Sequence, residues 1–318
     1  MTQYYKKTNY NKSTNPLITI ITPVYNRKEI LKRALKSVEA QTFKNFEYII
    51  VNDGSTENLD DIVESFMNRV RFPVVYIRKA NGGVHTARNL AIKEANGKYI
   101  VMLDSDDEIF PHTLQRFIDV WNTIPENEQQ NYLDVACRCV DQNGVPVSDP
   151  YPHNLNDLPL EKSRSANRKI HGEKFGMLNA TILKENLWPE PQGITFVTEN
   201  ILWDKLTLKY KTFFINDTLR IYHRETEISY TRPGKKTIQQ IKNARWNCMY
   251  RLNNPKIYIH GVKDYLKTII RYSVLNNVCH LKNIYDNENT LTQHYDKIME
   301  LLIRIPAYFM ASIYIKKE

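Results

Sequence analysis

Short apolar runs alternate with amphipathic segments over the first 125 residues of the chain. The runs are rich in β-branched and aromatic residues and occupy positions 17–22, 48–51, 74–77 and 99–103. Each is followed by a segment with apolar residues at helical spacing, at 28–41, 59–70, 84–95 and 111–121. Apolar strands that alternate with helices are typical of a parallel sheet covered by helices on both faces. The pattern therefore predicts a doubly wound, mostly parallel α/β unit over residues 17–125.

The pattern becomes less regular after this unit. A polar, Pro-bearing loop is predicted at 145–170, a helix at 199–208, and strands at 133–140, 212–215 and 219–222. Glycine and proline become rare from Lys235 onward, where long helical patterns continue.

We therefore expect three parts. They are a flexible N-terminal tail at 1–15, an α/β domain at 16–228 and a helical C-terminal extension at 229–318. Within the α/β domain, 16–125 is the expected ligand-binding part and 126–228 is a second part.

Polar residues follow each of the four predicted parallel strands. They are Thr22–Arg27, Asn52–Thr56, Lys79 with Asn81–Gly83, and Asp104–Asp107. Ligands of a parallel α/β sheet bind beyond the carboxyl ends of its strands, which all meet at one edge. These residues are therefore the candidates for a binding site.

Asp104 and Asp106 form an Asp-x-Asp sequence at the end of an apolar strand. An acidic turn alone is more often simply solvated, but Asp53 ends a neighbouring strand and favours a functional site here. Carboxylates are hard oxygen ligands that suit Mg²⁺ or Mn²⁺, which also bridge substrate phosphates. Asp53 itself fits either a ligand contact or an Asx turn.

A second candidate feature is the start of the helix that follows Gly82 and Gly83. Its backbone N–H groups suit a phosphate, although a G-x-G-x-x-G spacing is absent, so a dinucleotide site is not supported. Arg88, one turn into the helix, suits either a diphosphate or an aspartate partner.

The net charge becomes informative only when it is counted separately for different parts of the chain. The formal net charge is +9, yet residues 1–200 carry 24 basic and 25 acidic side chains, whereas 201–318 carry 20 and 10. The α/β unit is therefore almost neutral, and the basic surplus belongs to the last third of the chain.

The cysteines and the apolar content indicate a cytoplasmic protein. Cys137, Cys139, Cys248 and Cys279 have no metal-ligand spacing and are expected to be buried free thiols, as in a reducing compartment. The N-terminal residues contain no signal-peptide pattern, and no run of 18 apolar residues occurs.

Taken together, the strand-end motifs resemble those of the family 2 inverting glycosyltransferases. The motifs, in order, are Pro23-Val-Tyr-Asn26, Asn52-Asp53-Gly54-Ser55, Gly82-Gly83 followed by Ala87-Arg88-Asn89, and Leu103-Asp104-Ser105-Asp106-Asp107. The resemblance is strong over 17–125 and weaker over 170–225. It implies the GT-A fold, a nucleotide-diphosphosugar donor, a divalent cation (Mn²⁺ or Mg²⁺) and attack by an acceptor hydroxyl with inversion.

The resemblance also implies roles for individual residues on the donor side. The nucleotide sugar is expected to contact Pro23, Tyr25, Asn26, Asp53, Gly82, Gly83, His85, Arg88, Asp104 and Ser105. Pro23, Tyr25 and Asn26 would line the base pocket, and Asp104 would reach the ribose or a metal-bound water. Asp106 is the expected metal ligand, and His223 is a second candidate for the metal shell.

On the acceptor side, the resemblance implies a catalytic carboxylate at the start of a later helix. Glu199 occupies that place and is the expected base, although Asn200 stands where many members carry a second acid. The implied function is transfer of a sugar, most commonly from a UDP-sugar, to a glycan or lipid-linked acceptor in surface polysaccharide synthesis.

Three other classes compete with this interpretation. A nucleotidyltransferase acting on sugar phosphates would carry a Gly-rich basic loop after the first strand, where Pro23-Val-Tyr-Asn-Arg27 stands here. A nucleic-acid-binding protein leaves the acidic strand ends unexplained, so no nucleic acid partner is expected. An inactive protein of the same fold is disfavoured by the intact pair of aspartates.

The basic C-terminal region suggests where the protein is located. Eleven basic residues and one acid lie between Arg232 and Lys282, and the stretch 301–315 is largely apolar. We expect either peripheral association with the anionic inner face of the cell membrane or a subunit contact in a homo-oligomer.

Overall fold

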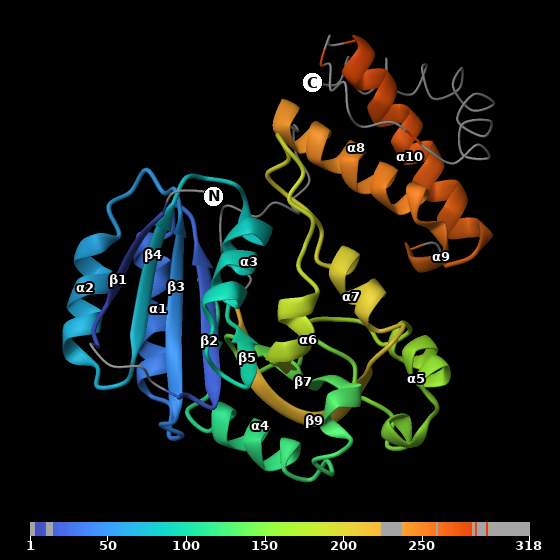
Figure 1. Ribbon diagram of the computed structural model, residues 1–318. Coiled ribbons are helices and arrows are strands. Elements are labelled where there is room, and N and C mark those ends of the chain that lie inside the picture. Colours follow the sequence, from blue (N-terminus) through green and yellow to red (C-terminus); the bar gives the residue numbers. More distant parts are fainter. Residues whose placement is uncertain are drawn as a thin grey trace. The chain divides into compact units, whose positions relative to one another are not determined.

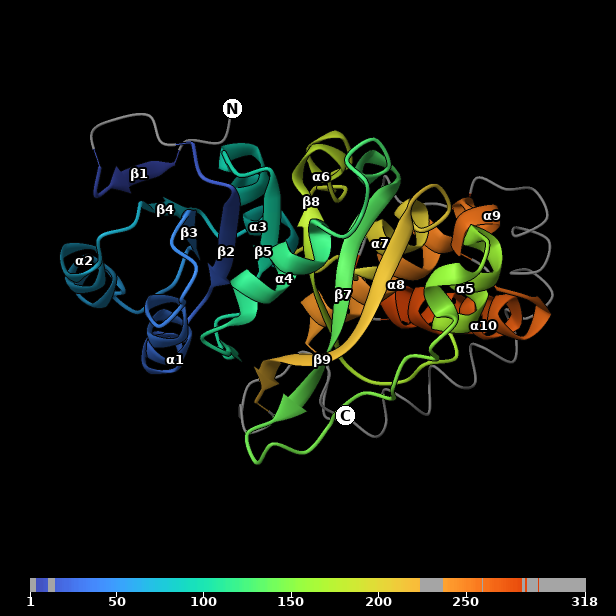
Figure 2. The ribbon, with the colours of Figure 1, turned by 90° about the horizontal axis from the view of Figure 1, so that it is seen from below.

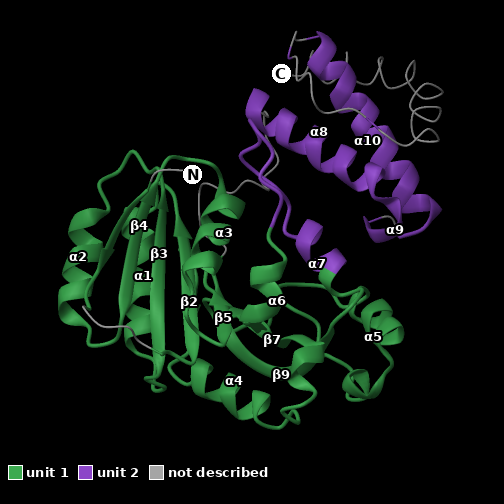
Figure 3. Ribbon diagram, in the orientation of Figure 1, with its two compact units in different colours: residues 1–187, 206–229 green, residues 188–205, 230–318 purple. Residues whose placement is uncertain are grey.

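The computed structural model describes residues 4–10, 15–223, 237–258 and 260–281, together with Ile284 and Leu291. The chain divides into two compact units (Figure 3). The first consists of residues 1–187 and 206–229, and the second of 188–205 and 230–318. Each unit is considered by itself below.

The described part of the first unit contains a nine-stranded sheet with the order β1-β4-β3-β2-β5-β8-β7-β9-β6. The strands are β1 (Tyr5–Thr8), β2 (Ile18–Val24), β3 (Phe46–Asp53), β4 (Val74–Lys79), β5 (Tyr99–Met102), β6 (Glu108–Ile109), β7 (Tyr132–Asp141), β8 (Lys174–Asn179) and β9 (Lys211–Tyr222). The central strands β4, β3, β2 and β5 are parallel. Strand β8 runs antiparallel between β5 and β7, and β7 is parallel to β9.

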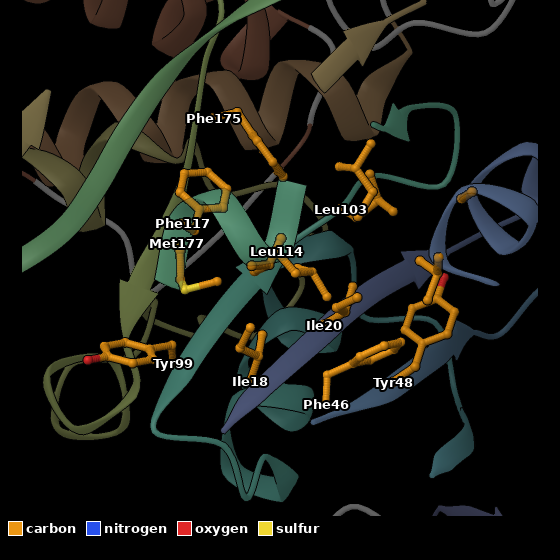
Figure 4. Close-up of a cluster of buried hydrophobic side chains, with 14 of the residues drawn as sticks. Ile18, Ile20, Phe46, Tyr48, Tyr99, Leu103, Leu114, Phe117, Phe175 and Met177 are labelled. Atoms are coloured by element: carbon orange, nitrogen blue, oxygen red, sulfur yellow. The ribbon is translucent and has the colours of Figure 1, made fainter. Parts of the chain in front are cut away.

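Helices cover both faces of the parallel strands (Figures 1 and 2). They are α1 (Lys28–Glu39), α2 (Asp60–Arg69), α3 (Val84–Glu94) and α4 (Thr113–Trp121). Alternate residues of β2 explain this arrangement, since Ile18 and Ile20 join one core with α1, α2 and α4, while α3 packs against β2 and β3. Figure 4 shows Leu114 and Phe117 of α4 among these strand residues. The predicted α/β fold class is confirmed.

Several elements were absent from the sequence prediction. Strand β1 lies within the expected flexible tail, where its polar residues YKKT pair antiparallel with β4. The expected loop at 145–170 contains the short helices η2 (Leu155–Asp157) and α5 (Leu160–Asn167). Further unpredicted elements are β6, β8, the helix α6 (Ala180–Glu185) and the 3₁₀ turn η1 (Gln129–Asn131).

Strand β9 is continuous where two strands were predicted. Its register with β7 shifts between the Ala136–Phe214 and Arg138–Thr218 pairs. Such a β-bulge changes the alternation of side chains without ending the strand. The interruption of the apolar pattern therefore marks a bulge and not a turn.

The second unit is helical, with α7 (Asn200–Leu206, of which Leu206 belongs to the first unit), α8 (Ile238–Asn253), α9 (Pro255–Tyr258) and α10 (Val262–Leu281). Helix α8 begins with a capping box formed by Thr237 and Gln240. The segment 188–205, which the sequence analysis assigned to the α/β domain, packs with these helices. The predicted boundary at 228/229 and the apolar stretch 301–315 lie outside the described residues.

Two asparagines of α8 hold that segment in place. The Asn243 side chain accepts a hydrogen bond from the Thr195 N–H at 3.0 Å and donates to the Thr195 hydroxyl at 3.2 Å. One turn later, Asn247 accepts from the Thr198 N–H at 3.0 Å and donates to the Phe196 carbonyl at 3.0 Å. Because both asparagines are buried, these bonds satisfy polar groups that would otherwise be costly to bury.

Two further predictions concern thiols and membrane spans. All four cysteines are buried and free, as expected. Among the described helices, none combines the length and the apolar character needed to cross a membrane.

Asp134 is a buried acid of β7 that lies away from the carboxyl edge of the parallel strands. Burial raises the pKa of Asp134 to about 6, although a hydrogen bond with Thr212 and the charge of Lys174 oppose the shift. The folded state therefore retains a proton that the unfolded chain loses near the ordinary pKa, so Asp134 reduces stability as the pH rises from about 4 to 6.

We predict that Asp134→Asn removes this dependence. The free energy of unfolding of the variant, relative to the wild type, should rise by on the order of 2 kcal/mol as the pH increases from 4 to 7. Urea unfolding at several pH values measures this difference. A difference that stays constant over the range would show that Asp134 does not retain the proton.

Candidate active site at the carboxyl edge of the parallel strands

Asn26 joins the loops that follow β2 and β3. Its backbone has a φ of 50°, in the left-handed region that asparagine tolerates better than most residues. The Asn26 N–H donates to the Ser55 hydroxyl at 3.0 Å, and its side-chain oxygen accepts from the Thr56 N–H at 2.8 Å. Of the other two residues predicted to line the base pocket, Pro23 is buried in β2 and Tyr25 is 40% exposed.

Asp53 links the end of β3 to the start of α3. Its carboxylate accepts hydrogen bonds from the N–H groups of Gly82 at 3.0 Å and Gly83 at 2.8 Å. These N–H groups have no acceptor within the helix, and a carboxylate there is also favoured by the helix dipole. The structure thus brings together three residues that were predicted to contact the donor, Asp53, Gly82 and Gly83. Here they form hydrogen bonds with one another.

Lys79 at the end of β4 neutralises Asp53. Its ammonium group contacts the Asp53 carboxylate, the Ala80 carbonyl at 2.7 Å and the Thr86 hydroxyl at 2.9 Å. Both charged side chains are almost completely buried, at 6% and 4% exposure. Gly54 allows the close approach of the two loops, because a Cβ there would lie 2.5 Å from the Asn81 backbone nitrogen.

The two aspartates of the Asp-x-Asp sequence each lie against an arginine from another element. Arg88 of α3 contacts Asp104 at 2.7 Å, and Arg27, just before α1, contacts Asp106 at 2.7 Å. Burial by itself would raise the pKa of Asp104, but the charges of Arg88, Arg220 and Arg27 hold that pKa below its ordinary value. Asp104 is therefore ionised at neutral pH, as a ligand of a cation must be.

A third carboxylate lies deeper. Asp107 is buried, accepts a hydrogen bond from the His223 N–H at 3.1 Å and lies 3.4 Å from the Arg220 guanidinium. Burial is the main cause that raises the pKa of Asp107 to about 7; Arg220 opposes the shift, while Asp104 and Asp106 add to it. Asp107 thus helps to hold the acidic loop in place through its contacts with His223 and Arg220.

His223 lies at the end of β9, next to the acidic loop because β9 pairs with β6. Its Nε2 lies 2.7 Å from a carboxylate oxygen of Glu108, and its Nδ1 contacts the guanidinium of Arg33. Since a guanidinium only donates, we assign Nδ1 as acceptor and Nε2 as donor. Both ring nitrogens are therefore engaged, and metal binding by His223 would require one of these contacts to open.

The remaining predicted residues are not all at this edge. His85 and Ser105 are buried in the first unit. Glu199 is exposed and belongs to the second unit, where its carbonyl accepts from the N–H groups of Leu202 and Trp203 at the start of α7. No role was expected from the sequence for Arg27, Arg33, Glu108, Arg220 or the two asparagines of α8. Of these, Arg27 and Glu108 directly follow recognised motifs.

The described residues contain no group of three or more His, Cys, Asp or Glu side chains that could hold a metal ion. Asp104 and Asp106 nevertheless fit a cation that a diphosphate helps to bind, because Mg²⁺ in such sites takes only one or two carboxylates from the protein. The nearby arginines suit the phosphates. The edge thus has the chemistry of a nucleotide-diphosphate site on an α/β sheet.

Comparison with known proteins bears on the resemblance inferred from the motifs. The model of glycosyl transferase family 2 matches residues 19–170, which include the four strand-end motifs. The resemblance to this family that the motifs indicated is therefore confirmed for residues 19–170. A nucleotidyltransferase is not favoured.

Relatives cover different shares of the chain. A glycosyltransferase of Rickettsia prowazekii is 31% identical over 194 residues, which are 61% of this chain and 54% of that protein. The chain thus matches about half the length of this relative. A GalNAc(5)-diNAcBac-PP-undecaprenol β-1,3-glucosyltransferase of Campylobacter jejuni is 24% identical over 302 residues, 93% of this chain and 92% of that protein.

Solved structures share the fold. S. aureus TarS 1–349 in complex with UDP-GlcNAc has a TM-score of 0.53 and 20% identity, over 92% of this chain and 81% of TarS 1–349. The Pyrobaculum calidifontis mannosyltransferase PcManGT, in complex with GDP-Man and Mn²⁺, has a TM-score of 0.53 and 14% identity, over 95% and 85% of the two chains. At these identities, the likeness shows the GT-A fold alone.

We predict that Asp53→Ala destabilises the first unit strongly. The substitution leaves the buried Lys79 ammonium without its carboxylate and two helix N–H groups without acceptors, which should cost about 3–5 kcal/mol. Guanidinium-induced unfolding measures the loss. The control is Glu39→Ala, which removes one partner of the exposed Arg69–Glu39 pair and should cost less than about 1 kcal/mol. Equal losses in both variants would refute the role given to Asp53.

Proposed function

We propose that the protein is an inverting glycosyltransferase that transfers a sugar from a nucleotide-diphosphosugar to a hydroxyl of a glycan or lipid-linked acceptor in surface polysaccharide synthesis. The observation that carries the proposal is the pairing of Asp104 and Asp106 with Arg88 and Arg27 at the carboxyl edge of a family 2 domain. A UDP-sugar is the proposed donor, supported by the UDP-GlcNAc complex of TarS. The undecaprenol-linked acceptor named for the Campylobacter relative supports a lipid-linked acceptor.

A screen of nucleotide sugars tests this proposal. The purified protein is incubated with UDP- and GDP-sugars in the presence of Mn²⁺ or Mg²⁺, and release of the nucleoside diphosphate is measured. We expect metal-dependent turnover of one donor, faster with a membrane extract that contains lipid-linked glycans. Failure to bind or turn over any nucleotide sugar would overturn the proposal.

The donor site is proposed to form around the loops that Asn26 and Asp53 hold together. The exposed Tyr25 ring can stack on the base, while Asp53 acts by fixing the Gly82–Gly83 turn and not by a direct contact. Arg88, paired with Asp104, is then near the diphosphate. His85 and Ser105 are buried and are proposed to support these loops from the protein interior.

A divalent cation is proposed to bind through Asp106, with Asp104 as a second carboxylate and His223 as a further candidate. Such an ion neutralises the donor diphosphate and stabilises the departing nucleotide. In the described structure, however, the Arg27 guanidinium lies 2.7 Å from Asp106. The Arg27 guanidinium therefore occupies the place next to the Asp106 carboxylate where the cation is proposed to bind. It must move away from Asp106 when the cation binds. The released guanidinium would then be available to a phosphate.

We predict that Arg27→Gln tightens Mn²⁺ binding to the donor-free protein on the order of fivefold, because a competing positive charge is removed. Binding is measured from free Mn²⁺ by electron paramagnetic resonance. The same variant should bind the nucleotide sugar more weakly, since a phosphate partner is lost.

Two variants complete this experiment. Lys28→Gln removes the neighbouring charge, which pairs with Asp61 at 2.6 Å instead, and should leave Mn²⁺ binding unchanged. Asp106→Asn should abolish it. Unchanged or weaker Mn²⁺ binding by Arg27→Gln would contradict the exchange.

Glu199 is proposed as the general base that takes the proton of the acceptor hydroxyl. It directly precedes α7 and follows Thr198, which Asn247 of α8 holds through the backbone N–H. A base is effective only when its carboxylate is positioned, and α8 supplies that support.

We predict that Glu199→Gln lowers the rate of sugar transfer about 10²- to 10⁴-fold while the donor dissociation constant stays unchanged. Transfer assays and calorimetric donor titration measure the two effects. Glu185→Gln, at an exposed glutamate of α6, serves as the control and should behave like the wild type. Full transfer by the Glu199 variant would remove Glu199 as the base.

The proposal also includes the location of the enzyme. A lipid-linked acceptor lies in a membrane, and we propose that the protein works in the cytoplasm at the anionic inner face of the cell membrane. A homo-oligomer is the competing proposal for the basic C-terminal region.

A further inference from the structure

Helix α10 presents two different faces. Thr268, Ile269 and Tyr272 are buried, and the helix packs against α8 (Figure 1). The exposed side of its first half carries Val262, which is 76% exposed, Leu266 at 40% and Ile270 at 39%. Because these three residues are four positions apart, they form one continuous apolar stripe about 12 Å long.

A column of basic residues runs beside this stripe. Lys263, Lys267 and Arg271 are all exposed and have the same spacing of four residues. Within the described part of the chain, these three side chains form no ion pair. The acid of this helix, Asp264, is already bound to Arg251 at 3.0 Å. Among the described residues, the column therefore carries three positive charges without an acidic partner.

We propose that this surface of α10, defined by Val262, Leu266 and Ile270 with Lys263, Lys267 and Arg271, lies on an anionic lipid bilayer. An amphipathic helix with basic residues beside an apolar stripe binds in the plane of the interface, where aliphatic side chains enter the headgroup region and the charges meet anionic lipids. The biological purpose of this contact rests on the proposed lipid-linked acceptor. The surface itself is defined by the exposed residues of α10 alone.

Two other partners fit the surface less well. In a symmetric dimer the same patch would meet itself, and the two basic columns would then repel each other without an acid to compensate them. Single-stranded nucleic acid is bound by basic residues together with exposed aromatic side chains, whereas this stripe is aliphatic. An anionic bilayer complements both parts of the surface, because its headgroup region accepts the apolar stripe and its anionic lipids attract the basic column.

Vesicle flotation with the full-length protein tests the proposal. Vesicles of phosphatidylcholine with and without 30% phosphatidylglycerol (about one anionic lipid in three) are compared at low and high salt. We expect binding to the anionic vesicles and a decrease with salt. Replacement of Lys263, Lys267 and Arg271 by Gln should lower the partition coefficient on the order of a hundredfold, since each basic residue contributes about a factor of five. Replacement of Val262, Leu266 and Ile270 by Asn should also lower it.

The matched control removes three exposed lysines of the first unit, Lys36, Lys93 and Lys162, and should bind like the wild type. Equal binding to neutral and anionic vesicles, or equal losses in the control and the α10 basic variant, would overturn the proposal. So would a dimer in solution that the Val262, Leu266 and Ile270 replacements dissociate. Donor turnover in solution is measured for every variant and should remain unchanged, so that a failure of membrane binding is separate from a failure of the proposed activity.

Discussion

The carboxyl edge of the parallel strands depends on opposite charges held close together. Each acid of the loops after β3 and β5 that forms the site lies against a basic side chain, as in Asp53 with Lys79 and Asp106 with Arg27. Several of these groups are buried, and a buried charge is tolerated only when it is paired and hydrogen-bonded. The pairs thus fix the loops before any ligand binds. Under the proposed function, a cation and a diphosphate would replace partners that are already present.

The two compact units divide the proposed chemistry. The donor-side residues belong to the first unit, where the ends of neighbouring strands position them. The proposed base, Glu199, belongs to the second unit, where Asn247 of α8 holds the preceding residue. The second unit therefore carries both the proposed base and the proposed membrane-binding surface. A substitution in α8 is expected to act on the acceptor step through Thr198 and Glu199.

Some predictions succeeded because the signal was local. The four apolar runs became β2, β3, β4 and β5, since a continuous apolar strand can be satisfied only between two layers of helices. Elements with weak signals were missed. Strand β1 consists of four polar residues that are ordered by pairing with β4. Strand β9 contains a bulge, which interrupts its apolar pattern and led to the prediction of two strands. The segment 188–205 was expected in the α/β domain and groups with the second unit, because its partners, Asn243 and Asn247, lie about 50 residues further on.

The sequence by itself determined the α/β class, the family and the edge of the sheet where the polar residues gather, because strand periodicity and strand-end motifs are written in consecutive residues. It also located the basic surplus in the C-terminal third. Only the tertiary structure decided which charges meet. Arg27 reaches Asp106, Arg220 reaches Asp107 and the Asp53 carboxylate reaches the start of α3 because the chain returns to the same edge after each helix. Such pairings depend on distances in space between residues far apart in the sequence, and no local pattern records them.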